Sequence, residues 1–348
     1  MSRARHRGFS LVELMVAMTI SLILLAGVLA VVYSSKVAYR QNERVARLQE
    51  NGRAAVELML QDMRAGGFHG CTRTVPFTNT LTTATDLLWN FAAPVQGYES
   101  TGAAAWSPAL DASVTSPHDG SDIVAVRTVR PGRPLMTTNA TMSSTTASIT
   151  VAKNVSDILA NGTPVMISDC SAAAVFGVTT FTDSSATATI AHASGGAVSG
   201  VGPGNGSTDL GVQFKTGAQV VPVDTIVYYI RDSATVRNGV TNPALWRIIG
   251  SGAPQELIEG IEVMQMLYGE DTDGDRLVNS YKTADTVINW NNVISVSFGM
   301  LIRSVEPNSP EVDSRTYTLL PGTTAGPFND HYERVLYTTT VTLRNTTS

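Results

Sequence analysis

The chain is poor in charge and in catalytic motifs. Only 15% of its 348 residues are charged, below the quarter or so that is usual in a soluble domain. The formal net charge of −5 gives no global basic signature, so we expect no direct contact with nucleic acid. The five histidines are scattered along the chain, and no Gly-x-Ser-x-Gly motif occurs. The sequence therefore does not indicate an enzyme.

Cysteine is equally scarce. The chain has two, Cys71 and Cys170, which are too few and too far apart for a zinc site. If the domain is exported, a disulfide between them is the natural interpretation. Two separately buried thiols are the alternative.

What the sequence does have is a long apolar run near its start, from Phe9 to Tyr33. As a helix, this run is long enough to cross the hydrocarbon core of a bilayer. Arg3, Arg5 and Arg7 precede it, and the positive-inside rule places that side in the cytoplasm and the rest of the chain outside. The run is too long for a secretory signal and no Ala-x-Ala site follows it.

A single acid, Glu13, interrupts this run. A carboxylate inside a membrane helix costs roughly 2.5–3.5 kcal/mol on insertion scales. An inert anchor has no reason to carry it, so we expect a functional residue with a charged partner. The alternative is that Glu13 reaches back to the nearby interface.

The segment RGFSLVEL, from Arg7 to Leu14, resembles the leader of type IV prepilins and pseudopilins. The resemblance implies that residues 1–8 are a leader and that a prepilin peptidase cuts between Gly8 and Phe9. It also implies methylation of the new N-terminus at Phe9. Glu13 would then pair with the N-terminal ammonium of a neighbouring subunit, because each buried charge offsets the other.

The helical pattern continues beyond the apolar run to Arg64, with apolar residues at helical spacing. The Gly66-Gly67 pair ends it. A helix of about 55 residues would be ~80 Å long. We expect residues 9–35 to form a transmembrane and filament-core part, and residues 36–65 to form an amphipathic part.

The sequence of the remainder, residues 66–348, predicts a β-rich globular head. Period-two alternation from Ile294 to Ile302 and from Val335 to Leu343 predicts antiparallel strands with one buried face. The fold class is therefore α+β and pilin-like, with the helix packed on an antiparallel sheet. Residues from about 137 to 217 are rich in Thr, Ser, Ala and Gly and predict an inserted β-rich subdomain. Further predicted strands are Ser121–Arg127, Asp224–Arg231, Ile261–Tyr268, Val165–Ile167 and the stretch from Val175 to Phe181.

Four further stretches resemble the minor pilins of type IV pili: LQENGRAAVELMLQDMRAGGFHGC, ISDCSAAAVFGVT, YGEDTDGDR and TTTVTLRN. The resemblance implies a minor pilin that primes pilus assembly within a tip complex. Its expected partners are the major pilin, other minor pilins, the prepilin peptidase, the inner-membrane assembly platform and a tip adhesin. It implies an inner-membrane protein with a periplasmic head that later joins the pilus, with roles in adhesion and twitching motility. Both cysteines lie inside these stretches, which favours a Cys71–Cys170 bridge, worth up to ~4.7 kcal/mol for a loop of ~100 residues.

Asp271, Asp273 and Asp275 alternate along one short stretch. Alternate carboxylates in a turning loop can converge on Ca²⁺, which takes six to eight oxygen ligands. Asn279, Asp285 or backbone carbonyls could complete the shell. The loop is not an EF-hand, because its glycine is at the fourth position. The alternative is a solvated acidic turn.

Two other functions remain open on the sequence. A type II secretion pseudopilin of the J type shares the leader and a large β domain. A membrane-tethered periplasmic binding protein would use the helix as an anchor alone.

Overall fold

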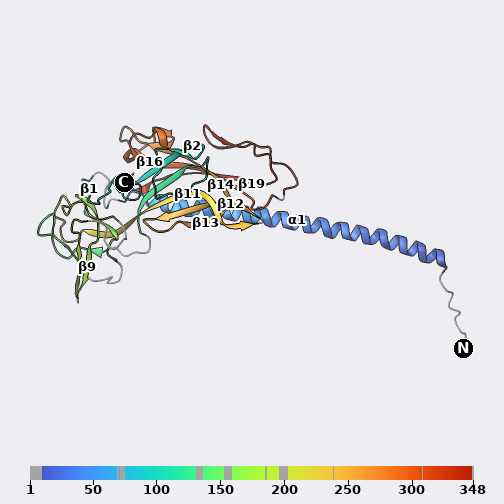
Figure 1. Ribbon diagram of the computed structural model, residues 1–348, viewed down its shortest axis with the longest axis horizontal. Helices are drawn as coiled ribbons and strands as arrows, with labels where there is room; N and C mark the ends of the chain where they lie inside the picture. Colours follow the sequence, from blue (N-terminus) through green and yellow to red (C-terminus); the bar gives the residue numbers. More distant parts are fainter. Residues whose placement is uncertain are drawn as a thin grey trace, which may run out of the picture. The chain divides into compact units, whose positions relative to one another are not determined.

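The structure is a computed structural model that describes residues 10–68, 70, 75–130, 136–152, 159–184, 186–195, 203–237, 239–307 and 309–346 (Figure 1). The chain divides into two compact units, Met1–Glu50 and Asn51–Ser348. Helix α1 (Leu11–Ala65) begins in the first unit and ends in the second, and it is long and apolar enough to span a membrane.

Helix α1 ends where the sequence predicts. The N–H of Gly66 donates to the carbonyl of Met63, and Gly67 has a φ of +75°. Only glycine adopts that left-handed conformation without steric cost. The two glycines therefore stop the helix and turn the chain toward the head.

The second unit is built mainly of strands, so the fold class is α+β as predicted. The strands are β1 (Phe77–Asn79), β2 (Val95–Gly102), β3 (Ala105–Ser107), β4 (Ile123–Val129), β5 (Met136–Thr137), β6 (Ile149–Ala152), β7 (Pro164–Ser168), β8 (Ala173–Gly177), β9 (Thr180–Asp183), β10 (Thr187–Ala191), β11 (Gln219–Arg237), β12 (Val240–Ile249), β13 (Gln255–Glu259), β14 (Ile261–Glu270), β15 (Ser280–Lys282), β16 (Val293–Arg303), β17 (Tyr317–Leu320), β18 (Thr323–Ala325) and β19 (Arg334–Thr342). Short 3-10 helices are η1 (Ala284–Thr286), η2 (Trp290–Asn292) and η3 (Arg344–Thr346).

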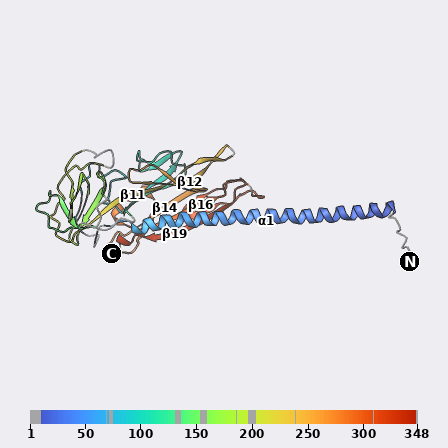
Figure 2. The same ribbon diagram turned by 90° about the horizontal axis from the view of Figure 1, so that it is seen from below.

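A four-stranded antiparallel sheet, β15-β14-β16-β19, carries the last third of the chain. Figure 2 shows β14, β16 and β19 next to one another. Every second residue of β16 from Val296 to Ile302 is fully buried, and Ser295 and Leu301, which point to the other face, are buried as well. The strand is therefore where the alternation predicts it, but the prediction of a single buried face is wrong for β16. The strands predicted at Ile261–Tyr268 and Val335–Leu343 are β14 and β19.

The end of α1 that belongs to the second unit packs on this sheet. A Cβ added to Gly52 would lie 2.2 Å from Cε2 of Tyr337 and 2.6 Å from Cδ1 of Ile302. The missing side chain lets the helix backbone approach the sheet closely. One and two turns further on, Ala55 and Met59 are fully buried, so the contact continues along the helix.

The larger sheet has ten strands, and β11 is its central element. Its first residues, Gln219–Pro222, pair with β7, Val223–Tyr228 pair with β4, and the residues from Ile226 onward pair with β12. One strand of 19 residues therefore joins three parts of the head. Figure 1 shows β11, β12 and β13 side by side.

Described residues between Met136 and Val220 form a hydrophobic core of their own. It includes Ile149, Phe176, Ile190 and Phe214, all with no exposed surface. A small sheet, β6-β10-β9, belongs to this region. The stretch from Val175 to Phe181 divides into β8 and β9, with residues 178–179 between them.

Candidate functional site

The first turn of α1 holds Glu13 in a reciprocal pair of hydrogen bonds with Ser10. The N–H of Ser10 donates to Oε2 of Glu13 at 3.0 Å, and the N–H of Glu13 donates to Oγ of Ser10 at 3.2 Å. This is a capping box, which satisfies two of the free N–H groups at a helix start. Sequence reasoning missed it, although Ser-x-x-Glu before an apolar run is its signature.

The capping box accounts for the position of Glu13 but not for its charge. Glutamine at the same position would make the same two hydrogen bonds without the cost of a charge in the membrane. We therefore still expect a cation to pair with the Glu13 carboxylate. Gly8 and Phe9 lie outside the described residues, so cleavage, methylation and pairing with a neighbour's N-terminus stay predictions.

Beyond Glu13, the first unit exposes a continuous apolar surface. The large apolar side chains from Leu11 to Tyr33 are between 46% and 76% exposed. A contiguous apolar surface of this size marks a membrane or protein interface. The described residues do not cover these apolar side chains, so lipid or other protein chains must cover them. The helix anchors the protein in a membrane.

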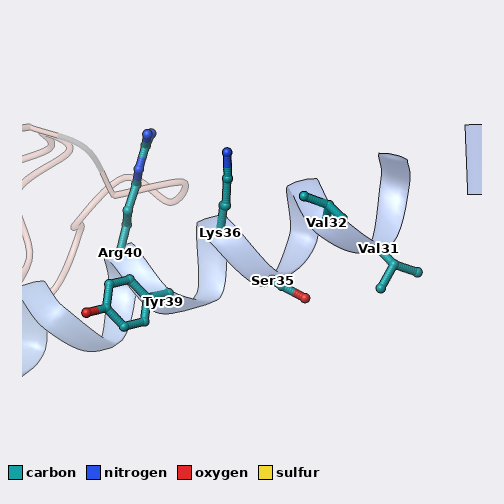
Figure 3. Close-up of a pocket in the computed structure, with 6 residues that line it drawn as sticks. All are labelled: Val31, Val32, Ser35, Lys36, Tyr39 and Arg40. Atoms are coloured by element: carbon teal, nitrogen blue, oxygen red, sulfur yellow. The ribbon is translucent and has the colours of Figure 1, made fainter. Parts of the chain in front are cut away.

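Polar and basic side chains follow directly after the apolar surface. Figure 3 shows four of them with two valines that precede them on α1: Val31, Val32, Ser35, Lys36, Tyr39 and Arg40. Lys36 and Arg40 extend from the same side of the helix (Figure 3), as residues four apart must. One turn on, Arg47 pairs with Glu43 at 2.7 Å.

The three predicted carboxylates of the loop after β14 do come together. One oxygen from each of Asp271, Asp273 and Asp275 lies within 4.8 Å of the others. Burial raises the pKa of Asp271, but N–H donation from Gly274 and Arg276 to its two oxygens outweighs this, so its pKa is lowered. Asp271 is therefore ionised at neutral pH.

The neighbours of this cluster only partly match the predicted shell. Asn279 donates from Nδ2 to Asp273, and its Oδ1 accepts from the N–H and hydroxyl of Thr272. Asp285 belongs to η1 instead, where it accepts from the hydroxyl of Thr283. Each ionised carboxylate has about four lone-pair sites, so the loop's own hydrogen bonds leave room for a cation. The arrangement fits both a Ca²⁺ site and an acidic turn.

Cys170 follows β7 and is disulfide-bonded. Cys71 lies outside the described residues, so the pairing Cys71–Cys170 stays a prediction.

A buried acid that sequence reasoning missed links the two large sheets. Asp122 accepts from the N–H of Ser100 in β2 at 2.9 Å and from the N–H of Met266 in β14 at 2.8 Å. Burial raises its pKa to about 8, with a contribution from Glu99 nearby. Burial likewise raises the pKa of Glu99 to about 7. A lone Asp before an apolar strand gives no signal of this role, because the link depends on where β14 lies.

Arg334 is a second missed residue. Its side chain has no exposed surface and contacts Glu262 and Asp330, each through two hydrogen bonds, and Asp313 through one at 3.2 Å. Burial lowers its pKa, but the hydrogen bonds to Asp330 and Glu262 outweigh this and raise it. The guanidinium thereby ties β14 and β19 to the segment between β16 and β19.

Comparison with known proteins adds two matches. Residues 227–345 match the family PilW, described as Type IV Pilus-assembly protein W. Residues 3–29 match the Prokaryotic N-terminal methylation motif. No curated protein and no solved structure matches the chain.

The two matches contain some of the features described above. The first contains the four-stranded sheet, the acidic loop and Arg334, and the second contains Gly8, Phe9 and Glu13. A pilus-assembly family is also what the resemblance in the sequence implies. Residues 227–345 are therefore similar to the PilW family of type IV pilus-assembly proteins, and the start of the chain carries the prokaryotic N-terminal methylation motif.

Proposed function

We propose that this protein is a minor pilin that enters the type IV pilus near its tip, within a minor-pilin complex that primes polymerisation of the major pilin. The proposal is supported by two features that occur together in one chain. An exposed apolar helix with an acid in its first turn precedes a head that matches the pilus-assembly family. The role requires no catalysis, because it consists of helix packing and charge pairing.

In the proposed mechanism, the prepilin peptidase cuts between Gly8 and Phe9 and methylates Phe9. The new ammonium and the Glu13 carboxylate are both costly in lipid, and pairing them across two subunits offsets that cost. Glu13 then exchanges the N–H of Ser10, its partner in the structure, for a neighbour's N-terminus. An incoming subunit therefore settles at the register in which this pair forms.

Before assembly, the protein would be a single-pass inner-membrane protein with its head in the periplasm. Its partners would be the assembly platform, the major pilin, other minor pilins and a tip adhesin. The match to the PilW family favours this role over that of a J-type pseudopilin of type II secretion. Loss of secretion with normal piliation in a deletion strain would favour the pseudopilin instead.

Two substitutions at Glu13 separate the pairing from the capping box. Glu13→Gln keeps the box and removes the charge, whereas Glu13→Ala removes both. We expect both to lower incorporation into pili on the order of a hundredfold, because breaking a buried ion pair costs about 3–5 kcal/mol and 1.4 kcal/mol is tenfold. The measurement is the amount of this subunit in sheared pili.

Glu43→Gln is the matched control, since Glu43 lies on the same helix and pairs locally with Arg47. It should leave incorporation unchanged. Normal incorporation of the Glu13→Gln protein together with loss in Glu13→Ala would assign Glu13 to the capping box alone and contradict the pairing.

We also propose that Asp271, Asp273 and Asp275 bind Ca²⁺. Ca²⁺ at a hundred times its dissociation constant should stabilise the head by about 2.7 kcal/mol, measured as a rise in melting temperature of the full chain in detergent. The Asp271→Asn/Asp273→Asn protein should show no rise. A melting temperature of the unsubstituted protein that is the same with Ca²⁺ and with chelator would leave the acidic turn as the correct interpretation.

A further inference from the structure

Lys36 and Arg40 form a pair of basic side chains on one side of α1, directly beyond its apolar surface (Figure 3). Both are exposed, and neither forms an ion pair with a described residue. The acid nearest to them along the same side, Glu43, is engaged by Arg47. The pair therefore presents two uncompensated positive charges.

The depth of this pair follows from helix geometry. The apolar stretch from Leu11 to Val32 spans ~33 Å at 1.5 Å per residue, which matches a hydrocarbon core of about 30 Å. Lys36 and Arg40 begin ~6 Å and ~12 Å beyond its end. Helical side chains tilt toward the N-terminus, so both side chains extend back toward the membrane, as basic residues near helix ends do.

Two tyrosines lie close to the pair, one on each side of Lys36 in the sequence. Tyr33 and Tyr39 are 73% and 71% exposed, on the turns before and after Lys36. Tyrosine is enriched at the membrane–water interface, where its ring lies at the level of the headgroups. Their position places Lys36 and Arg40 at the same level, where the anions available to the unassembled protein are lipid phosphates.

We propose that Lys36 and Arg40 form a binding site for the headgroup of an anionic phospholipid of the phosphatidylglycerol class. The leaflet is the one on the side of the head, and the site rests on the proposed insertion of α1 into the membrane. Two observations favour this ligand. The two basic side chains are complementary in charge to a lipid phosphate, and they directly follow the apolar surface that would contact the lipid tails. Arg40 can hold a phosphate through two N–H groups, and Lys36 adds a point charge.

For assembly, the lipid site would define how deep Glu13 lies in the membrane. Because α1 is one continuous helix, a headgroup held at Lys36 and Arg40 fixes the level of Glu13, about 35 Å away along the axis. Each unassembled subunit would then present Glu13 at the same depth to a neighbour's N-terminus. The site thus adds a lipid-dependent positioning step before pairing.

The test is a titration of the full-length mature protein with dioctanoyl phosphatidylglycerol and with dioctanoyl phosphatidylcholine, read as lipid adducts by native mass spectrometry. Each basic residue near a charged surface contributes about fivefold, so we expect phosphatidylglycerol to bind roughly thirtyfold more tightly. The Lys36→Gln/Arg40→Gln protein should lose this preference. The Lys36→Arg/Arg40→Lys protein should keep it.

Arg53→Gln/Arg64→Gln is the matched control, because both residues are exposed on the same helix. They lie ~25 Å or more beyond Lys36, well outside the Debye length of about 8–10 Å. The control protein should keep the preference. Equal binding of the two lipids by the unsubstituted protein, or an equal loss in the control, would overturn the site.

Incorporation into phosphatidylcholine nanodiscs separates this site from the function on which it rests. A protein that enters the nanodiscs but shows no preference for phosphatidylglycerol contradicts the site alone. A protein that is excluded from nanodiscs of every composition contradicts insertion as well. If Lys36→Gln/Arg40→Gln keeps the lipid preference but abolishes piliation, the pair faces an acidic neighbour in the filament and the lipid site is wrong.

Discussion

The two parts of α1 belong to one helix but differ in what surrounds them. In the first unit, Leu29 is 59% exposed, and its neighbours are similar. In the second unit, Ala55, Met59 and Met63 have no exposed surface. Both parts satisfy their backbone hydrogen bonds internally, as any helix does, so the difference lies in the side chains.

The contrast shows where each part obtains its stability. The part in the second unit is stabilised by burial against the head, within the same chain. The part in the first unit gains nothing comparable from the described residues, so its apolar side chains must be buried by lipid or by other subunits. Substitutions at matched positions should therefore affect different measurements.

The largest effect expected from this comparison is at Met59. Met59→Ala should lower the free energy of unfolding of the head by about 2–5 kcal/mol, because truncating a buried side chain leaves a cavity. Leu29→Ala should leave it unchanged. Urea unfolding of the full chain in detergent, followed by tryptophan fluorescence, measures this, since the chain's four tryptophans all lie after residue 50. Equal losses for the two proteins would contradict the division of the helix.

Substitutions at two glycines test the same difference between the two parts of α1, with a smaller expected change in stability. A Cβ at Gly52 would lie 2.2 Å from Cε2 of Tyr337, whereas a Cβ at Gly27 would have no neighbour within 4 Å. Overpacking costs about 1–3 kcal/mol, and the gain in helix propensity returns at most ~1 kcal/mol. Gly52→Ala should thus destabilise the head in the same unfolding measurement, and Gly27→Ala should not. A head that tolerates Gly52→Ala would show that helix and sheet are not in close contact.

A third expected difference is a pH dependence of the stability of the second unit. Asp122 has its pKa raised by burial from 3.8 to about 8, with Glu99 and Asp285 adding repulsion. The native state therefore binds more protons than the unfolded state between these values. The resulting stability is present in full below about pH 4 and is lost as the pH rises to about 8.

Unfolding of the head at pH 5 and at pH 8 measures this dependence. The unsubstituted protein should be more stable at pH 5, and Asp122→Asn should reduce the difference. Asp119→Asn, at an exposed position of the preceding turn, is the control and should leave it unchanged. A difference that persists in Asp122→Asn would assign the pH dependence to other groups.

The parts of the fold that local patterns encode were predicted well. The end of α1 follows from Gly66-Gly67, and β16 and β19 follow from alternation, because both signals depend only on neighbouring residues. The convergence of Asp271, Asp273 and Asp275 was predicted for the same reason, since the three lie within one turn. The continuous strand β11, with four different partners, was not predicted beyond its middle, since the pairing depends on distant segments.

The sequence by itself determined the apolar length of α1, the acid in its first turn and the positions of the regular strands. All of these depend on the order of residues over a few turns or less. Only the tertiary structure decided that α1 contacts the sheet at Gly52, that Asp122 links two sheets and that Arg334 is surrounded by three acids. These roles arise between residues far apart in the chain, where burial and pairing are set by how the sheets come together.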